Sequence, residues 1–223
     1  MEHWARVDDV TKTDPGLLAV LEESRRLGFL GPGPVEPQID HASSFLDGLT
    51  GRHDILDLGS GGGLPGLVLA TRVVHARFVL LDAQQRRCSF LTRAVQELEM
   101  SDRVSVELGR AEDLARRPDL RGQFDAVVAR SFGQPAVAAE CAVGFLHGPG
   151  AVLLISEPPT GSTERWPTNE LIELGLSPGE RWTGPHGTIQ QIDVIALCPE
   201  RYPRRVGVPT KRPLFHVEQV EGA

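Results

Sequence analysis

The chain has few cysteines and no long apolar run. Its three cysteines, at positions 88, 141 and 198, include no CxxC pair. This spacing predicts neither a disulfide framework nor a zinc site, so we expect buried thiols and no bound metal. No strictly apolar run exceeds five residues, the length of Ala151–Ile155. A membrane-spanning helix needs about 20 such residues, so we expect no membrane span.

Positive charge is also scarce, because the chain has only two lysines and a net charge of −7. Indiscriminate coating of nucleic acid depends on many Lys and Arg contacts to phosphate, so this charge argues against that class of function. The basic residues gather in the middle, where positions 51–130 carry twelve of them. A second basic run, from Arg201 to Arg212, is either a phosphate contact or a solvated surface loop. Residues 1–14 lack the apolar region of a secretory signal, so we expect a cytoplasmic protein.

Apolar runs alternate with helical patterns along most of the chain. We expect strands at 54–58, 78–81, 104–108, 124–129, 151–155 and 189–197, and helices beginning near 65 and spanning 87–100, 135–146 and 168–174. Such alternation predicts an α/β fold, a doubly wound and mostly parallel sheet with helices on both faces.

The ends of the chain differ from this central pattern. Helices expected at 15–27 and 38–49 make residues 1–50 a helical N-terminal cap. Residues 51–200 form the predicted ligand-binding domain, and residues 201–223 form a basic, proline-containing tail.

A glycine-rich turn, Gly59-Ser60-Gly61-Gly62-Gly63-Leu64-Pro65-Gly66, follows the first expected strand and opens a helix. Gly61, Gly63 and Gly66 satisfy the GxGxxG fingerprint of dinucleotide-binding proteins. Asp57, Gly59, Gly61 and Gly63 also satisfy the DxGxGxG pattern of class I S-adenosylmethionine methyltransferases. A P-loop is excluded because its Lys and Ser/Thr are missing. A loop that binds no small ligand is the third possibility.

Two strand-end carboxylates bear on this choice. Asp57 would repel a pyrophosphate, but it would favour a ligand with cationic amino and sulfonium groups, so S-adenosylmethionine is the preferred cofactor. Asp82 ends the second strand, where it can accept hydrogen bonds from both ribose hydroxyls. A nicotinamide cofactor would need the same contact, so Asp82 does not discriminate.

At these residues the sequence resembles the bacterial methyltransferases that modify guanine N7 in small-subunit (16S) ribosomal RNA, also called glucose-inhibited division protein B. The resemblance covers roughly residues 35–157, and its most specific element is the LeuProGly continuation of the glycine turn. The other matching segments are Pro37–His41, Gln84–Leu91, Gly109–Glu112 and Ala129–Ser131. The resemblance implies a Rossmann-like class I methyltransferase fold, S-adenosylmethionine as cofactor, and 16S ribosomal RNA or the small ribosomal subunit as partner.

Carried over residue by residue, the resemblance also implies a cofactor site. Gly59 and Leu64 would border the methionine part of the cofactor, Asp82 the ribose, and Ala111 and Glu112 the adenine. Other roles are possible: Leu64 could be a packing residue, and Glu112 could be a carboxylate at the start of a helix.

Arg130 would line the mouth of the active site, and His41 would belong to the helix that precedes the first strand. Arg110 and Arg130 could bind phosphate or the O6 edge of guanine. Guanine N7 has an available lone pair, so the reaction needs no general base, and catalysis would rest on positioning. The alternative for Arg130 is a pair with Asp125 or with another surface acid.

One departure from the family stands out. Its members usually carry Lys-Gly after the fifth strand, whereas this chain has Ile155-Ser156-Glu157-Pro158-Pro159. No neighbouring lysine can replace the missing one, which puts RNA contact in question. Two alternative functions therefore stay open: a noncatalytic S-adenosylmethionine-binding protein, and a small-molecule methyltransferase on the same fold.

Overall fold

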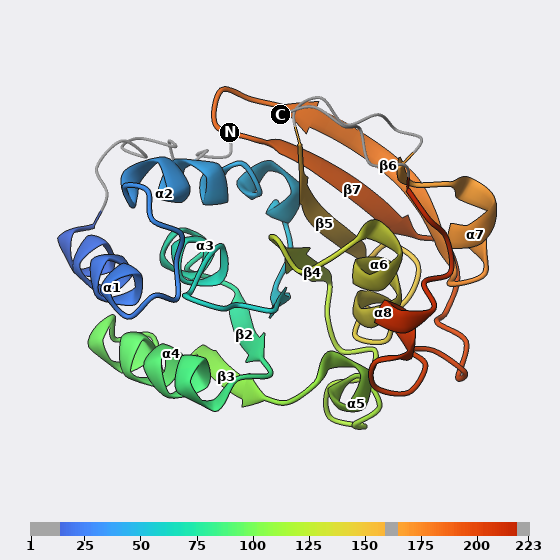
Figure 1. Ribbon diagram of the computed structural model, residues 1–223, viewed down its shortest axis with the longest axis horizontal. Helices are drawn as coiled ribbons and strands as arrows, with labels where there is room; N and C mark the ends of the chain where they lie inside the picture. The colour runs from blue at the N-terminus through green and yellow to red at the C-terminus, as the bar shows by residue number, and fades with distance from the viewer. Residues whose placement is uncertain (1–13, 159–164, 218–223) are drawn as a thin grey trace, which may run out of the picture.

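The computed structural model describes residues 14–158 and 165–217, which fold around a seven-stranded sheet (Figure 1). The strand order is β3-β2-β1-β4-β5-β7-β6. The first five strands are parallel, whereas β7 runs antiparallel to both β5 and β6. This topology confirms the predicted doubly wound, mostly parallel α/β fold. The strands are β1 (Asp54–Leu58), β2 (Arg77–Asp82), β3 (Val104–Leu108), β4 (Ala126–Ala129), β5 (Val152–Glu157), β6 (Leu176–Thr183) and β7 (Thr188–Val194).

Helices cover both faces of the sheet (Figure 1). One face carries α1 (Pro15–Arg26), α2 (Glu36–Ser43), the 3₁₀ helix η1 (Leu46–Leu49), α3 (Gly66–Arg72) and α4 (Gln85–Glu97). The other carries α5 (Ala111–Leu114), α6 (Pro135–Val143), α7 (Thr168–Ile172) and α8 (Val208–Lys211). Alternate strand residues point to opposite faces. In β1, Ile55 packs with the first group, and Leu56 and Leu58 pack with the second.

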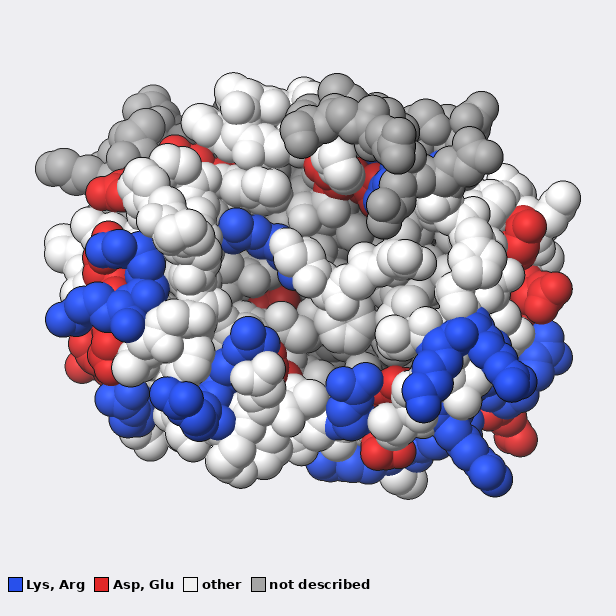
Figure 2. Space-filling model, in the orientation of Figure 1, with Lys and Arg blue, Asp and Glu red and all other residues white. Residues whose placement is uncertain are grey.

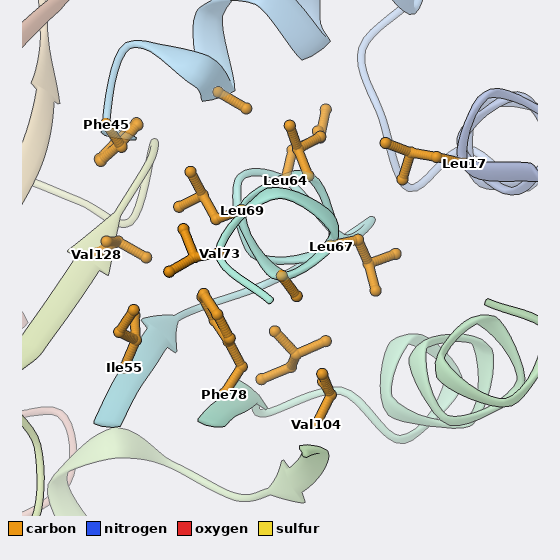
Figure 3. Packing of buried hydrophobic residues seen from close by; sticks show 14 of the residues in the cluster. Leu17, Phe45, Ile55, Leu64, Leu67, Leu69, Val73, Phe78, Val104 and Val128 are labelled. Atoms are coloured by element: carbon orange, nitrogen blue, oxygen red, sulfur yellow. The ribbon is translucent and has the colours of Figure 1, made fainter. Parts of the chain in front are cut away.

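The N-terminal helices belong to the main core. Figure 3 shows Leu69 of α3 on the side of the helix where the sheet residues Ile55 and Phe78 lie, with Phe45 and Leu17 entering the same cluster from the N-terminal segment. The side chains of all five are 2% exposed or less. Burial of a Leu or Phe side chain contributes about 1.5 to 3 kcal/mol, so the N-terminal helices are fixed to the sheet by apolar contact.

Some details of the structure differ from the sequence-based expectations. The second N-terminal helix ends at Ser43, and a 3₁₀ turn follows it. Strand β6 was not expected, because Pro178 and Gly179 interrupt its pattern; the pairing of β6 with β7 shifts register between Pro178 and Arg181. Cys88 and Cys141 are buried as expected, but the prediction was wrong for Cys198, which is only half-buried.

In the described part of the chain, no helix is both long enough and apolar enough to cross a membrane.

Candidate functional site

The glycine turn joins β1 to α3 at the carboxyl edge of the parallel strands. The N–H groups of Gly59 and Ser60 both donate to the carbonyl of Leu81 in β2, at 2.8 and 2.9 Å, which ties the turn to the neighbouring strand. Gly59, Gly61 and Gly63 have φ values of +77°, +53° and +101°. Side chains with a Cβ rarely adopt this left-handed conformation, so the path of the turn requires glycine.

Asp57 lies behind this turn and is fully buried. Its Oδ2 accepts the N–H of Gly66 at 3.0 Å, at the first residue of α3. Its Oδ1 is buried and has no hydrogen-bond partner among the described residues. Burial raises the pKa of Asp57 to about 7, although hydrogen bonds from Ser60 and Gly66 oppose the increase. Asp57 therefore supports the turn from behind and does not line the cavities in front of it.

Asp82 fastens the turn from the other side. Its Oδ2 accepts the N–H of Gly61 at 2.9 Å, and its Oδ1 accepts the N–H of Gln84 at 2.8 Å. Arg87 pairs with the same carboxylate at 3.5 Å. A strand-end carboxylate was expected here from the sequence, but its two backbone contacts were not. Each carboxylate oxygen can accept more than one hydrogen bond, so Asp82 can hold the turn and also contact a ligand.

A cavity of about 440 Å³ opens beside the turn, within the range of small-ligand sites. It brings together five of the residues expected from the sequence: Gly59, Asp82, Arg110, Ala111 and Glu112. Figure 2 shows the hollow on this face, with acidic atoms at its depth and basic side chains around it.

A smaller hollow of about 210 Å³ adjoins this cavity, because the two share Gly59, Arg87 and Ser131. Gly61, Leu64 and Arg130 line it. Leu64 is only 6% exposed and packs into the apolar core. It is therefore a packing residue that also lines the hollow. Gly63 lines neither space, and a Cβ there would lie 2.5 Å from Cδ1 of Leu67.

Glu112 stands at the far end of the larger cavity, in the first turn of α5. Its Oε1 accepts the N–H of Gly207 at 2.9 Å and lies 3.3 Å from Nη2 of Arg110. Burial acts to raise the pKa of Glu112, but the N–H of Gly207, its own backbone N–H and the Arg110 guanidinium outweigh burial, and the pKa lies below its usual range. Arg110 is thus paired on the cavity wall, with half of its side chain exposed.

The C-terminal segment forms part of this wall. Arg204 donates to both oxygens of Glu140 in α6, at 2.8 and 2.6 Å, and the Glu140 side chain is fully buried. Tyr202 and Phe215 are buried in the same apolar cluster, and Thr210 lines the cavity. Arg204 therefore forms an internal ion pair. The prediction that the basic residues from 201 to 212 are a phosphate contact or a solvated loop was wrong for Arg204. The boundary expected at residue 200 stays a prediction.

Arg130 follows β4 and reaches towards α2, where its Nη2 donates to Oε1 of Gln38 at 3.4 Å. Its Nη1 is buried without a hydrogen-bond partner in the described segments. Burial lowers the pKa of Arg130, and the nearby Asp57 partly offsets this effect. The alternative pair with Asp125 does not form, since the Asp125 carboxylate accepts the N–H groups of His53 and Asp54.

A third cavity, of about 390 Å³, lies at the ends of β4 and β5 and has His41, Phe132, Glu157 and Arg165 on its wall. Burial lowers the pKa of His41, and Arg130 lowers it further. Glu157 belongs to the segment in which Ser and Glu replace the family's usual Lys-Gly, but Arg165 pairs with it at 2.6 Å and Arg181 lies 3.9 Å away. No basic residue stands next to Glu157 in the sequence, so neither arginine was expected as its partner.

No group of three or more His, Cys, Asp or Glu side chains that could hold a metal ion occurs within residues 14–158 and 165–217.

The strand order, the glycine turn after β1 and the carboxylate that ends β2 define a protein with the class I methyltransferase fold. The model of the family described as rRNA small subunit methyltransferase G matches residues 39–159. The chain belongs to this family, which confirms the resemblance found in the sequence.

Individual relatives agree with this assignment. The "Ribosomal RNA small subunit methyltransferase G" of Deinococcus deserti is 33% identical over 186 residues, covering 77% of this chain and 75% of the relative. The protein of the same name from Synechococcus sp. (strain WH7803) is 35% identical over 188 residues, covering 81% of this chain and 71% of the relative. An O-methyltransferase from Bacillus cereus, solved in complex with SAH, has a similar fold, with a TM-score of 0.59 and 19% identity over 83% of this chain and 94% of that one.

Proposed function

We propose that this protein transfers a methyl group from S-adenosylmethionine to guanine N7 in small-subunit (16S) ribosomal RNA. Membership of a family described as rRNA small subunit methyltransferases supports the substrate. The observation that carries the proposal is the cavity beside the glycine turn, where Gly59, Asp82 and the neighbouring pair Ala111 and Glu112 meet although they come from three separate segments of the chain. A protein that acts on this substrate would work in the cytoplasm.

The shape of the turn supports the cofactor. At Gly61, the nearest atom to an added Cβ would be the Gly59 carbonyl oxygen at 3.7 Å, so a side chain there would occupy space that a ligand could use. Asp82 would hold the ribose, and Ala111 and Glu112 would border the adenine. Gly59 and Leu64 would border the methionine part, with Gly61 providing close backbone approach. Asp57 and Gly63 would shape the turn, because neither lines the cavity.

When bound, S-adenosylmethionine supplies a methyl group on a positively charged sulfur. Guanine N7 attacks with a lone pair that carries no proton, so the chain needs no general base, and positioning is its main contribution. Arg130 lies between the smaller hollow and α2, where its unpaired Nη1 can donate to guanine O6 or to a phosphate. A donor on N7 itself would block the reaction, so we assign Arg130 to one of those acceptors.

Basic side chains near the cavities suit an RNA substrate. Arg87, Arg110 and Arg130 line the two adjoining spaces, and Figure 2 shows further Lys and Arg side chains on both sides of the hollow. Phosphate contacts of this kind weaken as salt increases. We therefore expect methyl transfer to RNA to fall with ionic strength.

The test is incubation of the purified protein with methyl-labelled S-adenosylmethionine and small ribosomal subunits or naked 16S RNA, followed by nucleoside analysis. The proposal expects label in 7-methylguanosine from one or both RNA samples. Cofactor binding without transfer to either RNA would favour a noncatalytic binding protein. Label that appears only in small molecules of a cell extract would favour a small-molecule methyltransferase.

A further inference from the structure

The third cavity contains a buried acid in mostly apolar surroundings. Phe132, Pro135 and Ile155 supply apolar wall, and Glu157 supplies a carboxylate whose side chain is 2% exposed. The cavity shares Ser131 and Phe132 with the proposed cofactor cavity. A flat ligand bound here would therefore lie next to the cofactor, at the carboxyl ends of β4 and β5, where open α/β sheets bind ligands.

Two arginines compensate the burial of this carboxylate. Nε of Arg165 donates to Oε2 of Glu157 at 2.6 Å, and Nη1 of Arg181 lies 3.9 Å from the same oxygen. Arg181 also donates through Nη2 to the Pro158 carbonyl at 3.1 Å, which fixes its position. A buried charge is tolerated only when it is paired in this way. Both cations engage Oε2, and no hydrogen bond to Oε1 is found among residues 14–158 and 165–217, so we take Oε1 as the oxygen that a ligand would use.

A second polar side chain on the cavity wall has an atom without a hydrogen-bond partner. His41 lines the cavity, and its Nε2 is buried and has no hydrogen-bond partner among the described residues. Buried polar atoms are usually paired, and an exception often marks a place where water or a ligand binds. The cavity thus combines an aromatic side chain, a fixed carboxylate and an unpaired ring nitrogen, a combination suited to a nucleobase.

We propose that Glu157 recognises the Watson–Crick edge of the target guanine through Oε1, with the base against Phe132. This inference rests on the proposed function. An ionised carboxylate only accepts hydrogen bonds, and guanine offers it two adjacent donors, N1–H and the 2-amino group. Adenine has an acceptor at N1 and no 2-amino group, so it would offer Oε1 neither of these two donors. Recognition of this edge leaves N7 free of donors, and bases splayed out of RNA commonly stack on aromatic side chains.

The experiment removes one donor from the base and one acceptor from the protein. Labelling first identifies the methylated guanosine, and small subunits are then reconstituted with RNA that carries guanosine or inosine at that position. Inosine lacks the 2-amino group but keeps N1–H, O6 and N7. For the wild-type protein we expect inosine to lower kcat/KM about tenfold or more, the range for a hydrogen bond to a charged group.

Glu157→Gln should methylate guanosine more slowly and no longer discriminate between guanosine and inosine. Its ratio of kcat/KM for guanosine to kcat/KM for inosine should be near one. The ratio compares two substrates with one protein sample, so a partly unfolded variant does not distort it. Glu157→Asp keeps an acceptor-only carboxylate and should retain a preference for guanosine. Glu180→Gln, at an exposed glutamate in β6, is the matched control and should keep the full wild-type ratio.

An unchanged ratio in Glu157→Gln, or a wild-type protein that methylates both substrates equally, would overturn the assignment of Glu157 while the proposed function stands. Wild-type protein that transfers no methyl group to the guanosine RNA would overturn the proposed function, and the assignment with it.

Discussion

Replacement of Asp57 by asparagine should change how the stability of the protein depends on pH. Burial raises the pKa of Asp57 from 3.8 to about 7, with Asp82 adding to the increase and Arg130 opposing it. Between these values the folded protein keeps a proton that the unfolded chain has lost. This group therefore favours folding most at low pH, and its contribution falls as pH rises towards 7, by about 1.4 kcal/mol per pH unit.

The expected magnitude follows from that slope. Two pH units, from 5 to 7, correspond to about 3 kcal/mol of stability lost by the wild-type protein through this one group. The asparagine side chain cannot ionise, but its oxygen can still accept the N–H of Gly66. The free energy of unfolding of Asp57→Asn should therefore rise relative to wild type by about 2 to 3 kcal/mol between pH 5 and pH 8.

Urea unfolding followed by tryptophan fluorescence, without cofactor, measures both proteins across this range. Asp102→Asn, at an exposed aspartate, serves as the control and should differ from wild type by a constant amount. If the difference between Asp57→Asn and wild type is also constant from pH 5 to 8, the folded protein does not hold the extra proton, and our account of the buried carboxylate is wrong.

Three further predictions concern the cavities. Gly61→Leu should weaken S-adenosylmethionine binding at least tenfold. Both Gly61→Leu and Gly63→Leu strain a left-handed backbone, but Gly63→Leu should lower Tm further because its side chain also overlaps Leu67. Calorimetry on the folded protein and thermal unfolding separate the two variants, and equal effects on binding and on Tm would argue against the site. Asp82→Asn should reduce both Tm and cofactor affinity, the latter by about 1.5 to 3 kcal/mol, and unchanged Tm would show that its two backbone contacts are unimportant. Arg130→Ala should lower the rate of methyl transfer at least tenfold, equivalent to about 1.4 kcal/mol, with a smaller change in cofactor affinity; a wild-type rate would exclude Arg130 from the reaction.

Local patterns explain why much of the sheet was predictable. The bounds of β1 and β3 agree with the expected ranges 54–58 and 104–108, since each is a short apolar or alternating run between turns. The glycine turn was equally visible, because its positive φ values demand a residue type that the sequence displays. Strand β6 was not expected because Pro178 and Gly179 are unfavourable in strands, and its pairing with β7 forms only in the folded chain.

The contacts that complete the cavity walls were not predictable from local pattern. Glu112 accepts a hydrogen bond from Gly207, and Glu140 is paired with Arg204, so each contact joins residues far apart in the chain. The sequence shows that an arginine needs hydrogen-bond acceptors. It does not show which acceptors these are, because the partner depends on how the backbone folds. Glu140 offered one indirect signal, an acid on an otherwise apolar helix, which requires a buried cation.

Methyl transfer to guanine N7 in small-subunit RNA leaves a product that can be recognised by its chemistry. Borohydride reduction followed by aniline cleaves RNA at 7-methylguanosine and leaves unmodified guanosine intact. Small ribosomal subunits that lack the modification are incubated with the protein, with and without S-adenosylmethionine, and the RNA is treated and mapped by primer extension. We predict a new cleavage at a guanosine that depends on both protein and cofactor. If protein that binds the cofactor leaves this RNA uncleaved, both in the subunit and as naked RNA, the account is contradicted.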